Sequence, residues 1–197
     1  MRDIRICFIG DSFVNGTGDP TYLGWTGRVC AAMASSKCSL THYNLGIRGN
    51  TSEQIEARWQ AETALRFPHD CDRRLVFSFG TNDNRIENNQ IFVEPHNSIA
   101  CAERILTTAK AQCLTLLVGP PPIADPEANL RAMSTSNAYS QLCNKLAVPY
   151  LDTYTPLSKN AVWMKEVALV DGAHPAAGGY SALADLVLNW SAWQAWF

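Results

Sequence analysis

The residue best placed for nucleophilic chemistry is Ser12, which follows an apolar segment that ends at Gly10. A glycine permits a sharp turn, and a serine directly after it would stand at the start of a helix, where backbone N–H groups point outward. Such a hydroxyl can attack a carbonyl carbon while its own N–H binds the oxyanion that forms. The competing interpretation is an ordinary N-cap serine, and this segment alone favours that simpler role.

A serine nucleophile needs a base, and His174 has the neighbours that suit this role. It lies in the run Asp-Gly-Ala-His-Pro, so the carboxylate of Asp171 precedes it by three residues. In a tight turn Asp171 can accept the Nδ1–H of His174, which holds the tautomer and stabilises the imidazolium. A local turn hydrogen bond is the alternative. The other histidines are His42 in a predicted strand, His69 in a polar turn and His96 at a predicted helix start.

Two further positions suit the binding of an oxyanion. Asn82 follows the third apolar segment, in the run Gly-Thr-Asn-Asp, and its side-chain amide can donate a hydrogen bond. Gly46 follows the second segment, and its N–H and that of Ser12 complete the expected donors. Alternatively, residues 82–84 form a loop whose side chains bond their own backbone. Each signal is weak alone, but their joint placement at successive strand ends is not expected by chance.

Alternating apolar runs and helical patterns must bring these residues together. The predicted strands are Ile4–Ile9, Leu40–Leu45, Arg74–Phe79, Leu114–Val118 and Val148–Leu151. The predicted helices are Trp25–Ser35, Thr51–Phe67, Pro95–Lys110, Glu127–Leu146 and Ala176–Trp196. This alternation predicts an α/β layered fold with a mainly parallel sheet. Sites in such sheets lie at the carboxyl ends of the strands, which is where the candidate residues occur.

In this combination the residues resemble the SGNH hydrolases, also called GDSL-type esterases and lipases. The four namesake positions occur in family order as Ser12, Gly46, Asn82 and His174. The resemblance implies a three-layer α/β/α, flavodoxin-like domain with a five-stranded parallel sheet in the order 2-1-3-4-5. It implies Ser12 as nucleophile, His174 as base and then acid, and Asp171 as the residue that orients it. The implied oxyanion hole consists of the Ser12 N–H, the Gly46 N–H and the Asn82 side chain.

The activity implied by the resemblance is hydrolysis of carboxylic esters, of a short acyl or acetyl group, without metal or cofactor. A thioesterase or a carbohydrate deacetylase would use the same mechanism. A ligand-binding module without turnover is the alternative from another class, with an acidic or nucleotide ligand at residues 15–18. Such a binding module would leave Asp171, His174 and Asn82 without a shared function. Phe13 stands where the family name has Leu, and we expect a change in packing only.

The sequence defines the substrate pocket less well than the catalytic and oxyanion-binding residues. The candidates are Asp11, Tyr22, Trp25, Arg48 and Phe92, with Leu23, Ile86, Ile91 and Val93 as further positions that shape it. A core anchor is the alternative role of Trp25, and a surface salt bridge that of Arg48.

Composition excludes several classes of protein. The 197 residues suit a single domain over residues 1–197, and 47% of them are hydrophobic, which excludes disorder. A net charge of −2 argues against nucleic acid as a partner and favours a neutral ester. No apolar run is long enough for a membrane span. The chain starts directly in a strand-like run, so no signal peptide is expected and a cytoplasmic location is predicted.

The cysteines and the C-terminal tryptophans lead to two further predictions. The seven cysteines form no Cys-x-x-Cys pair, and we expect reduced thiols that pack as small hydrophobes. Trp190, Trp193 and Trp196 recur every three residues, so a shared helical face is predicted. Packing in the core is the expected role of that face, and a homo-oligomer interface is the alternative.

Overall fold

A parallel sheet forms the centre of the molecule, of which the computed structural model describes residues 2–33 and 38–197. Its strands are β1 (Arg2–Gly10), β2 (Cys38–Gly46), β3 (Asp72–Ser78), β6 (Leu114–Val118) and β7 (Tyr150–Leu151). Every neighbouring pair is parallel, and the order is β2-β1-β3-β6-β7. Counted along the sheet strands, this is the expected order 2-1-3-4-5. Gly10 pairs with Gly46 on one side and with Ser78 on the other, so three strand ends meet at one edge.

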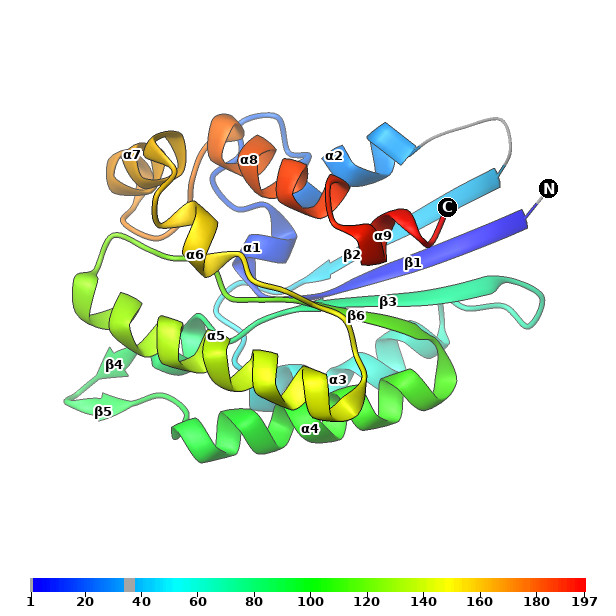
Figure 1. The fold of residues 1–197 in the computed structure, drawn as a ribbon, viewed down its shortest axis with the longest axis horizontal. Helices are drawn as coiled ribbons and strands as arrows, with labels where there is room; N and C mark the ends of the chain where they lie inside the picture. Colours follow the sequence, from blue (N-terminus) through cyan, green and yellow to red (C-terminus); the bar gives the residue numbers. More distant parts are fainter. Residues whose placement is uncertain (1, 34–37) are drawn as a thin grey trace.

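Helices cover both faces of this sheet (Figure 1). They are α1 (Ser12–Asn15), α2 (Gly24–Met33), α3 (Ser52–Ala64), α4 (Pro95–Gln112), α5 (Pro126–Leu146), α6 (Tyr154–Leu157), α7 (Ala161–Val170), α8 (Ala177–Leu188) and α9 (Ser191–Gln194). One face carries α2, α7 and α8, and the other carries α3, α4 and α5. The arrangement is therefore the three-layer α/β/α sandwich that the resemblance implies.

The alternation of side chains along β1 divides the core into two layers. Ile4, Ile6 and Phe8 belong to the cluster that packs beneath α2, α7 and α8. Cys7 and Ile9 point to the opposite face and belong to the cluster beneath α3, α4 and α5. Because both faces of a parallel strand are covered, the buried part of β1 from Ile6 to Ile9 is apolar throughout. This burial holds the end of β1, and with it the residues that follow, in one position.

The connections between the layers contain elements that the apolar periodicity does not reveal. After β3 the chain forms a 3₁₀ turn, η1 (Asn82–Asn84), and a small hairpin of β4 (Ile86–Glu87) and β5 (Gln90–Ile91). Helix α7, which precedes the predicted Asp171–His174 turn, was also not expected. Several predicted boundaries differ as well: β7 is only two residues long, because it pairs with β6 over two positions alone.

The predicted C-terminal helix Ala176–Trp196 is wrong in its length. The chain leaves the helix after Leu188, and Trp190 is the N-cap of the separate helix α9. Trp193 and Trp196 are buried in the core, which confirms the expected packing role for these two, whereas Trp190 is partly exposed. An assembly through this region stays a prediction. The predicted helix Trp25–Ser35 is described to Met33, and its last two residues lie outside the described part.

The cysteine side chains that the structure describes are free thiols, at positions Cys7, Cys30, Cys71, Cys101, Cys113 and Cys143. Burial raises the pKa of Cys7, Cys30 and Cys143 to about 12. These three thiols therefore stay protonated and unreactive at neutral pH. The side chain of Cys38 lies outside the described part. Within residues 2–33 and 38–197, no helix has both the length and the apolar character needed to cross a membrane.

Candidate active site

The turn after β1 presents Ser12 at the first position of α1. Asp11 is the N-cap, and its side chain accepts the Phe13 N–H at 2.9 Å. A Cβ on Gly10 would lie 2.0 Å from the carbonyl oxygen of Ser78, so the neighbouring strand admits only glycine here. The serine is buried, and as the first residue of the helix its N–H has no carbonyl partner within the helix. Strand pairing and helix capping together therefore fix the position of the Ser12 hydroxyl.

The turn after α7 presents His174 with its carboxylate partner. Asp171 is the C-cap of α7, and its Oδ1 accepts the N–H groups of Ala173 at 3.0 Å and of His174 at 2.8 Å. Its Oδ2 lies 2.7 Å from Nδ1 of His174. Partial burial opposes ionisation of Asp171, but the hydrogen bonds from His174 and Ala173 outweigh it and lower the pKa below its usual value. The carboxylate is thus ionised at neutral pH.

Ser12 and His174, which are 162 residues apart in the sequence, meet at this edge of the sheet. Nε2 of His174 lies 2.7 Å from Oγ of Ser12. An ionised Asp171 can only accept hydrogen bonds, so Nδ1 carries the proton of the neutral imidazole and Nε2 is the acceptor. The Ser12 hydroxyl therefore donates to Nε2. The three predicted catalytic side chains form one continuous hydrogen-bonded chain.

Asn82 begins η1 at the end of β3 and faces the same site. Its Nδ2 donates to the backbone oxygen of Asn50 at 3.0 Å and to Oδ2 of Asp11 at 3.3 Å. Asp11 lies behind the nucleophile with 1% of its surface exposed, and burial raises its pKa to about 7. The longer of the two bonds joins Asn82 to the residue that directly precedes Ser12. The amide of Asn82 therefore lies beside the turn that holds Ser12.

The predicted role of Gly46 does not agree with the structure. Its N–H donates to Oδ1 of Asn44 at 3.0 Å, and a Cβ on it would lie 2.2 Å from the Asn15 nitrogen. The glycine is thus packed against α1 rather than open to the site. Gly49, three residues later, lines the pocket with Ser12 and has open space around its Cα. Within the described residues, the Gly49 N–H donates no hydrogen bond.

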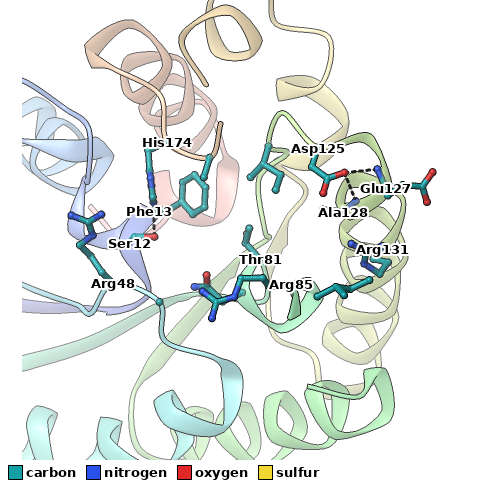
Figure 2. A pocket seen from close by; sticks show the side chains of 15 residues that line it. Ser12, Phe13, Arg48, Thr81, Arg85, Asp125, Glu127, Ala128, Arg131 and His174 are labelled. Carbon is teal, nitrogen blue, oxygen red and sulfur yellow. Dashed lines mark hydrogen bonds between the residues drawn. The ribbon is translucent and has the colours of Figure 1, made fainter. Parts of the chain in front are cut away.

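A cavity of about 760 Å³ opens beside the Ser12–His174 pair (Figure 2). This volume is within the range of small-molecule sites. Ser12, Phe13 and His174 lie at one end with Arg48 beside them, and the start of α5 lies at the other end. The ring of Phe13 also packs against the imidazole of His174, so its effect is not confined to packing in the core. The cavity therefore gives a ligand access to the reactive hydroxyl.

Only some of the predicted pocket residues line this cavity. Arg48 does, whereas Asp11 and Trp25 are buried beneath the surface and Tyr22 is 92% exposed outside it. Phe92 lies under the Arg85 guanidinium, 3.9 Å from its ring centroid, and does not line the cavity. Of the further candidates Leu23, Ile86, Ile91 and Val93, only Ile86 lines it. Side-chain direction, which the sequence does not specify in loops, accounts for these differences.

The rest of the cavity lining consists of residues that were not among the predicted site residues. They are Thr81, Arg85, Ile123, Asp125, Glu127, Ala128, Arg131 and Ala173. Arg85 follows Asn82 by three residues, a spacing that one turn of 3₁₀ helix brings to the same side, so a signal for it existed. The α5 residues carry no comparable signal, because only the packing of α5 beside η1 brings them to the site.

Comparisons with known proteins identify the family and the fold. The sequence profile of the GDSL-like lipase/acylhydrolase family matches residues 8–182. No protein matches in the search of curated sequences. A lipase/acylhydrolase from Enterococcus faecalis superposes with a TM-score of 0.75 at 22% identity, covering 95% of this chain and 94% of that one. An acetylxylan esterase from Geobacillus stearothermophilus gives a TM-score of 0.75 at 19% identity, with 96% and 95% covered.

A third similar structure is a lipolytic protein of the G-D-S-L family from Veillonella parvula. It has a TM-score of 0.74 at 18% identity, with 94% of this chain and 96% of that chain covered. These likenesses show the fold, and the profile match spans most of the sequence. The chain belongs to the GDSL-like lipase/acylhydrolase family, whose activity is hydrolysis of esters.

Proposed function

We propose that this protein hydrolyses carboxylic esters through an acyl-enzyme formed on Ser12. The observation that carries the proposal is the chain from Ser12 Oγ to His174 Nε2 and from His174 Nδ1 to Asp171, with 2.7 Å at each contact. At Ser12 this series of hydrogen bonds reaches a cavity large enough for a substrate. A ligand-binding module would need neither contact, so it is the less supported alternative.

The proposed reaction has two halves. The Ser12 oxygen attacks the ester carbonyl as His174 Nε2 takes its proton, and the imidazolium is stabilised by Asp171. The tetrahedral intermediate then collapses, and His174 gives the proton to the leaving alcohol. In the second half, the same nitrogen takes a proton from a water molecule that attacks the acyl carbonyl, and it returns this proton to the Ser12 oxygen as the acid leaves. Because both contacts of His174 are already 2.7 Å long, the proton passes between groups that are aligned before the substrate binds.

The proposed oxyanion hole consists of the Ser12 N–H, the Gly49 N–H and the Asn82 amide. All three residues line the cavity. The first two groups have no acceptor among the described residues, and Asn82 exchanges its long bond to Asp11 for the oxyanion. Gly49 replaces Gly46 in this proposal because the Gly46 N–H is already used by Asn44.

Esters of a short acyl or acetyl group are the proposed substrates. Two of the structures with this fold are described as an acetylxylan esterase and an acetyl-xylooligosaccharide esterase. Catalytic variants of that esterase replace a serine, an aspartate and a histidine, the residue types that meet here. An acetylated carbohydrate is therefore the favoured second candidate, and a thioester would follow the same mechanism.

The test is hydrolysis of 4-nitrophenyl acetate together with labelling by a fluorophosphonate probe. We expect Ser12→Ala to lose both turnover and labelling. Ser158→Ala is the matched control, since Ser158 caps the end of α6 outside the cavity, and it should retain both. Equal rates for Ser12→Ala and the wild-type protein would refute the proposal.

A further inference from the structure

Three arginine side chains line the cavity that contains Ser12 and His174. They come from separate parts of the fold: Arg48 from the turn after β2, Arg85 from the end of η1, and Arg131 from α5. Figure 2 shows Arg48 beside Ser12 and Arg131 on the side of α5. A positive lining is unexpected in a chain whose net charge is −2.

Two of these guanidinium groups have no ion-pair partner. Within residues 2–33 and 38–197, no carboxylate lies within 4.0 Å of Arg48 or Arg131. Arg85 contacts Glu87 at 3.3 Å in an exposed pair, and it stacks on Phe92. Exposed pairs of this kind are weak and are readily exchanged for another anion. The three arginines outnumber the two carboxylates that line the cavity, and two of the three are unpaired among the described residues.

The two carboxylates at the same cavity do not neutralise Arg131. Oδ1 of Asp125 accepts the N–H groups of Glu127 and Ala128, so this carboxylate caps the first turn of α5. Figure 2 shows the Glu127 carboxylate directed away from Ser12. Neither residue lies within ion-pair distance of an arginine, although both line the cavity.

Arg131 is also held in place. Its Nε donates to the backbone oxygen of Asn84 at 2.9 Å, and Asn84 directly precedes Arg85. Among the described residues, the two terminal nitrogens of Arg131 have no hydrogen-bond partner, and the bond through Nε holds Arg131 against the segment that carries Arg85. A guanidinium fixed through Nε and open at its other nitrogens is pre-organised to bind a carboxylate.

We propose that the ester substrate carries a carboxylate, which Arg131 and Arg85 bind while Ser12 attacks the ester carbonyl. Arg48 adds positive potential beside the nucleophile and raises the local concentration of anionic esters. This inference rests on the proposed function and names its substrate class. An anionic ester is proposed in place of the neutral ester expected from the net charge. The reason is that the residues lining the cavity carry a net positive charge, whereas the whole chain has a net charge of −2.

The test compares anionic esters with neutral isosteres. For a charged leaving group, 4-acetoxybenzoate is compared with 4-acetoxybenzamide. For a charged acyl group, the mono-4-nitrophenyl ester of terephthalate is compared with that of terephthalamate. The rigid para geometry keeps each carboxylate from attacking its own ester. We expect kcat/KM of at least one anionic ester to exceed that of its amide about tenfold, the effect of one charge-assisted hydrogen bond. The ratio should shrink in about 1 M NaCl.

Arg131→Gln and Arg85→Gln should each reduce this anion-to-amide ratio about tenfold. Arg104→Gln is the matched control, because Arg104 pairs with Glu56 on the outer surface of α3 and α4 and should leave the ratio unchanged. The inference is overturned if neither anionic ester is preferred by the wild-type protein, or if both cavity variants keep the wild-type ratio.

The experiments distinguish a protein that hydrolyses no ester from an esterase that has no preference for anionic esters. If the wild-type protein turns over no ester, calorimetric titration with terephthalate still tests the anion site. Binding to the wild-type protein that is lost in Arg131→Gln would support the site, and the absence of wild-type binding would refute it. Turnover of the amide esters without an anionic preference would leave the esterase proposal intact and refute the inference.

Discussion

The ring of Phe13 packs against the imidazole of His174, with centroids 5.1 Å apart and planes inclined by 41°. Phe13 follows the nucleophile directly, and its other neighbour is Trp163 of α7, at 6.2 Å. One side chain therefore links the turn that holds Ser12 to the turn that holds His174. The family name places a leucine at this position, which would offer less surface to the imidazole.

Substitution of Phe13 should change both stability and catalysis. Phe13→Ala removes a buried ring and is expected to lower the free energy of unfolding by about 3–5 kcal/mol. Phe13→Leu should cost about 1 kcal/mol and lower kcat, since the imidazole loses part of its support. Phe8→Leu, in the same core cluster without contact to His174, is the control for stability loss alone. Identical kcat values for the two leucine variants would contradict the role assigned to Phe13.

Removal of the Asn82 amide should act on the transition state. We expect Asn82→Ala to lower kcat about 10²–10³-fold, the usual effect of losing one oxyanion donor, with little change in KM. Steady-state kinetics with 4-nitrophenyl acetate measures this, and Asn97→Ala on the exposed surface of α4 is the control. A change confined to KM would place Asn82 in substrate binding instead.

Asp171→Asn should disturb the tautomer of His174 rather than the fold. The asparagine can offer an N–H to Nδ1, which then becomes the acceptor and leaves Nε2 protonated toward Ser12. We expect kcat to fall by about 10²–10⁴-fold near pH 7. Because the pKa of Asp171 lies below its usual value, wild-type activity should not report its titration above about pH 5. Wild-type kcat in the variant at neutral pH would exclude the proposed role.

Asp11 should make the stability of the protein depend on pH. Burial raises its folded pKa to about 7, against about 3.9 in an unfolded chain, so the folded state binds the proton more tightly. Its contribution is fully present below about pH 4 and is lost as the pH rises to about 7, by a few kcal/mol. Urea unfolding of the wild-type protein and of Asp11→Asn, which mimics the protonated side chain, isolates this effect. A constant difference between the two across this range would refute it.

Trp193→Ala should destabilise the molecule. The indole is fully buried and contacts Phe8, Trp196 and Phe197, at centroid distances of 6.1, 5.7 and 5.3 Å. We expect a loss of about 3–5 kcal/mol in denaturant unfolding. Trp190→Ala removes a partly exposed ring and should cost less. Sedimentation of both variants also tests the predicted assembly, since only an interface through this region would change the mass of Trp190→Ala.

Sequence patterns alone predicted the layered α/β fold and the three residues that the structure joins in one hydrogen-bonded chain. Ser12, Asp171 and His174 are recognisable because their roles depend on short local geometry: a strand-to-helix turn for the serine, and a three-residue turn that joins the carboxylate to the imidazole. The order of the sheet strands followed from the family resemblance. These two turns can be recognised from the sequence because the backbone conformation of a turn depends largely on neighbouring residues.

The residues that line the cavity could not be predicted from the sequence, because they depend on the packing of separate elements. Gly46 ends β2, and Gly49 lies in the turn three residues later. The choice between them depends on the Asn44 side chain, which accepts the Gly46 N–H and donates to Val14 and Thr26. It depends also on the packing of α1 against the end of β2. Arg131 reaches the cavity because α5 packs beside η1, which no pattern in either segment specifies. The physical reason is that side-chain direction and free donors depend on contacts between elements that are distant in the sequence.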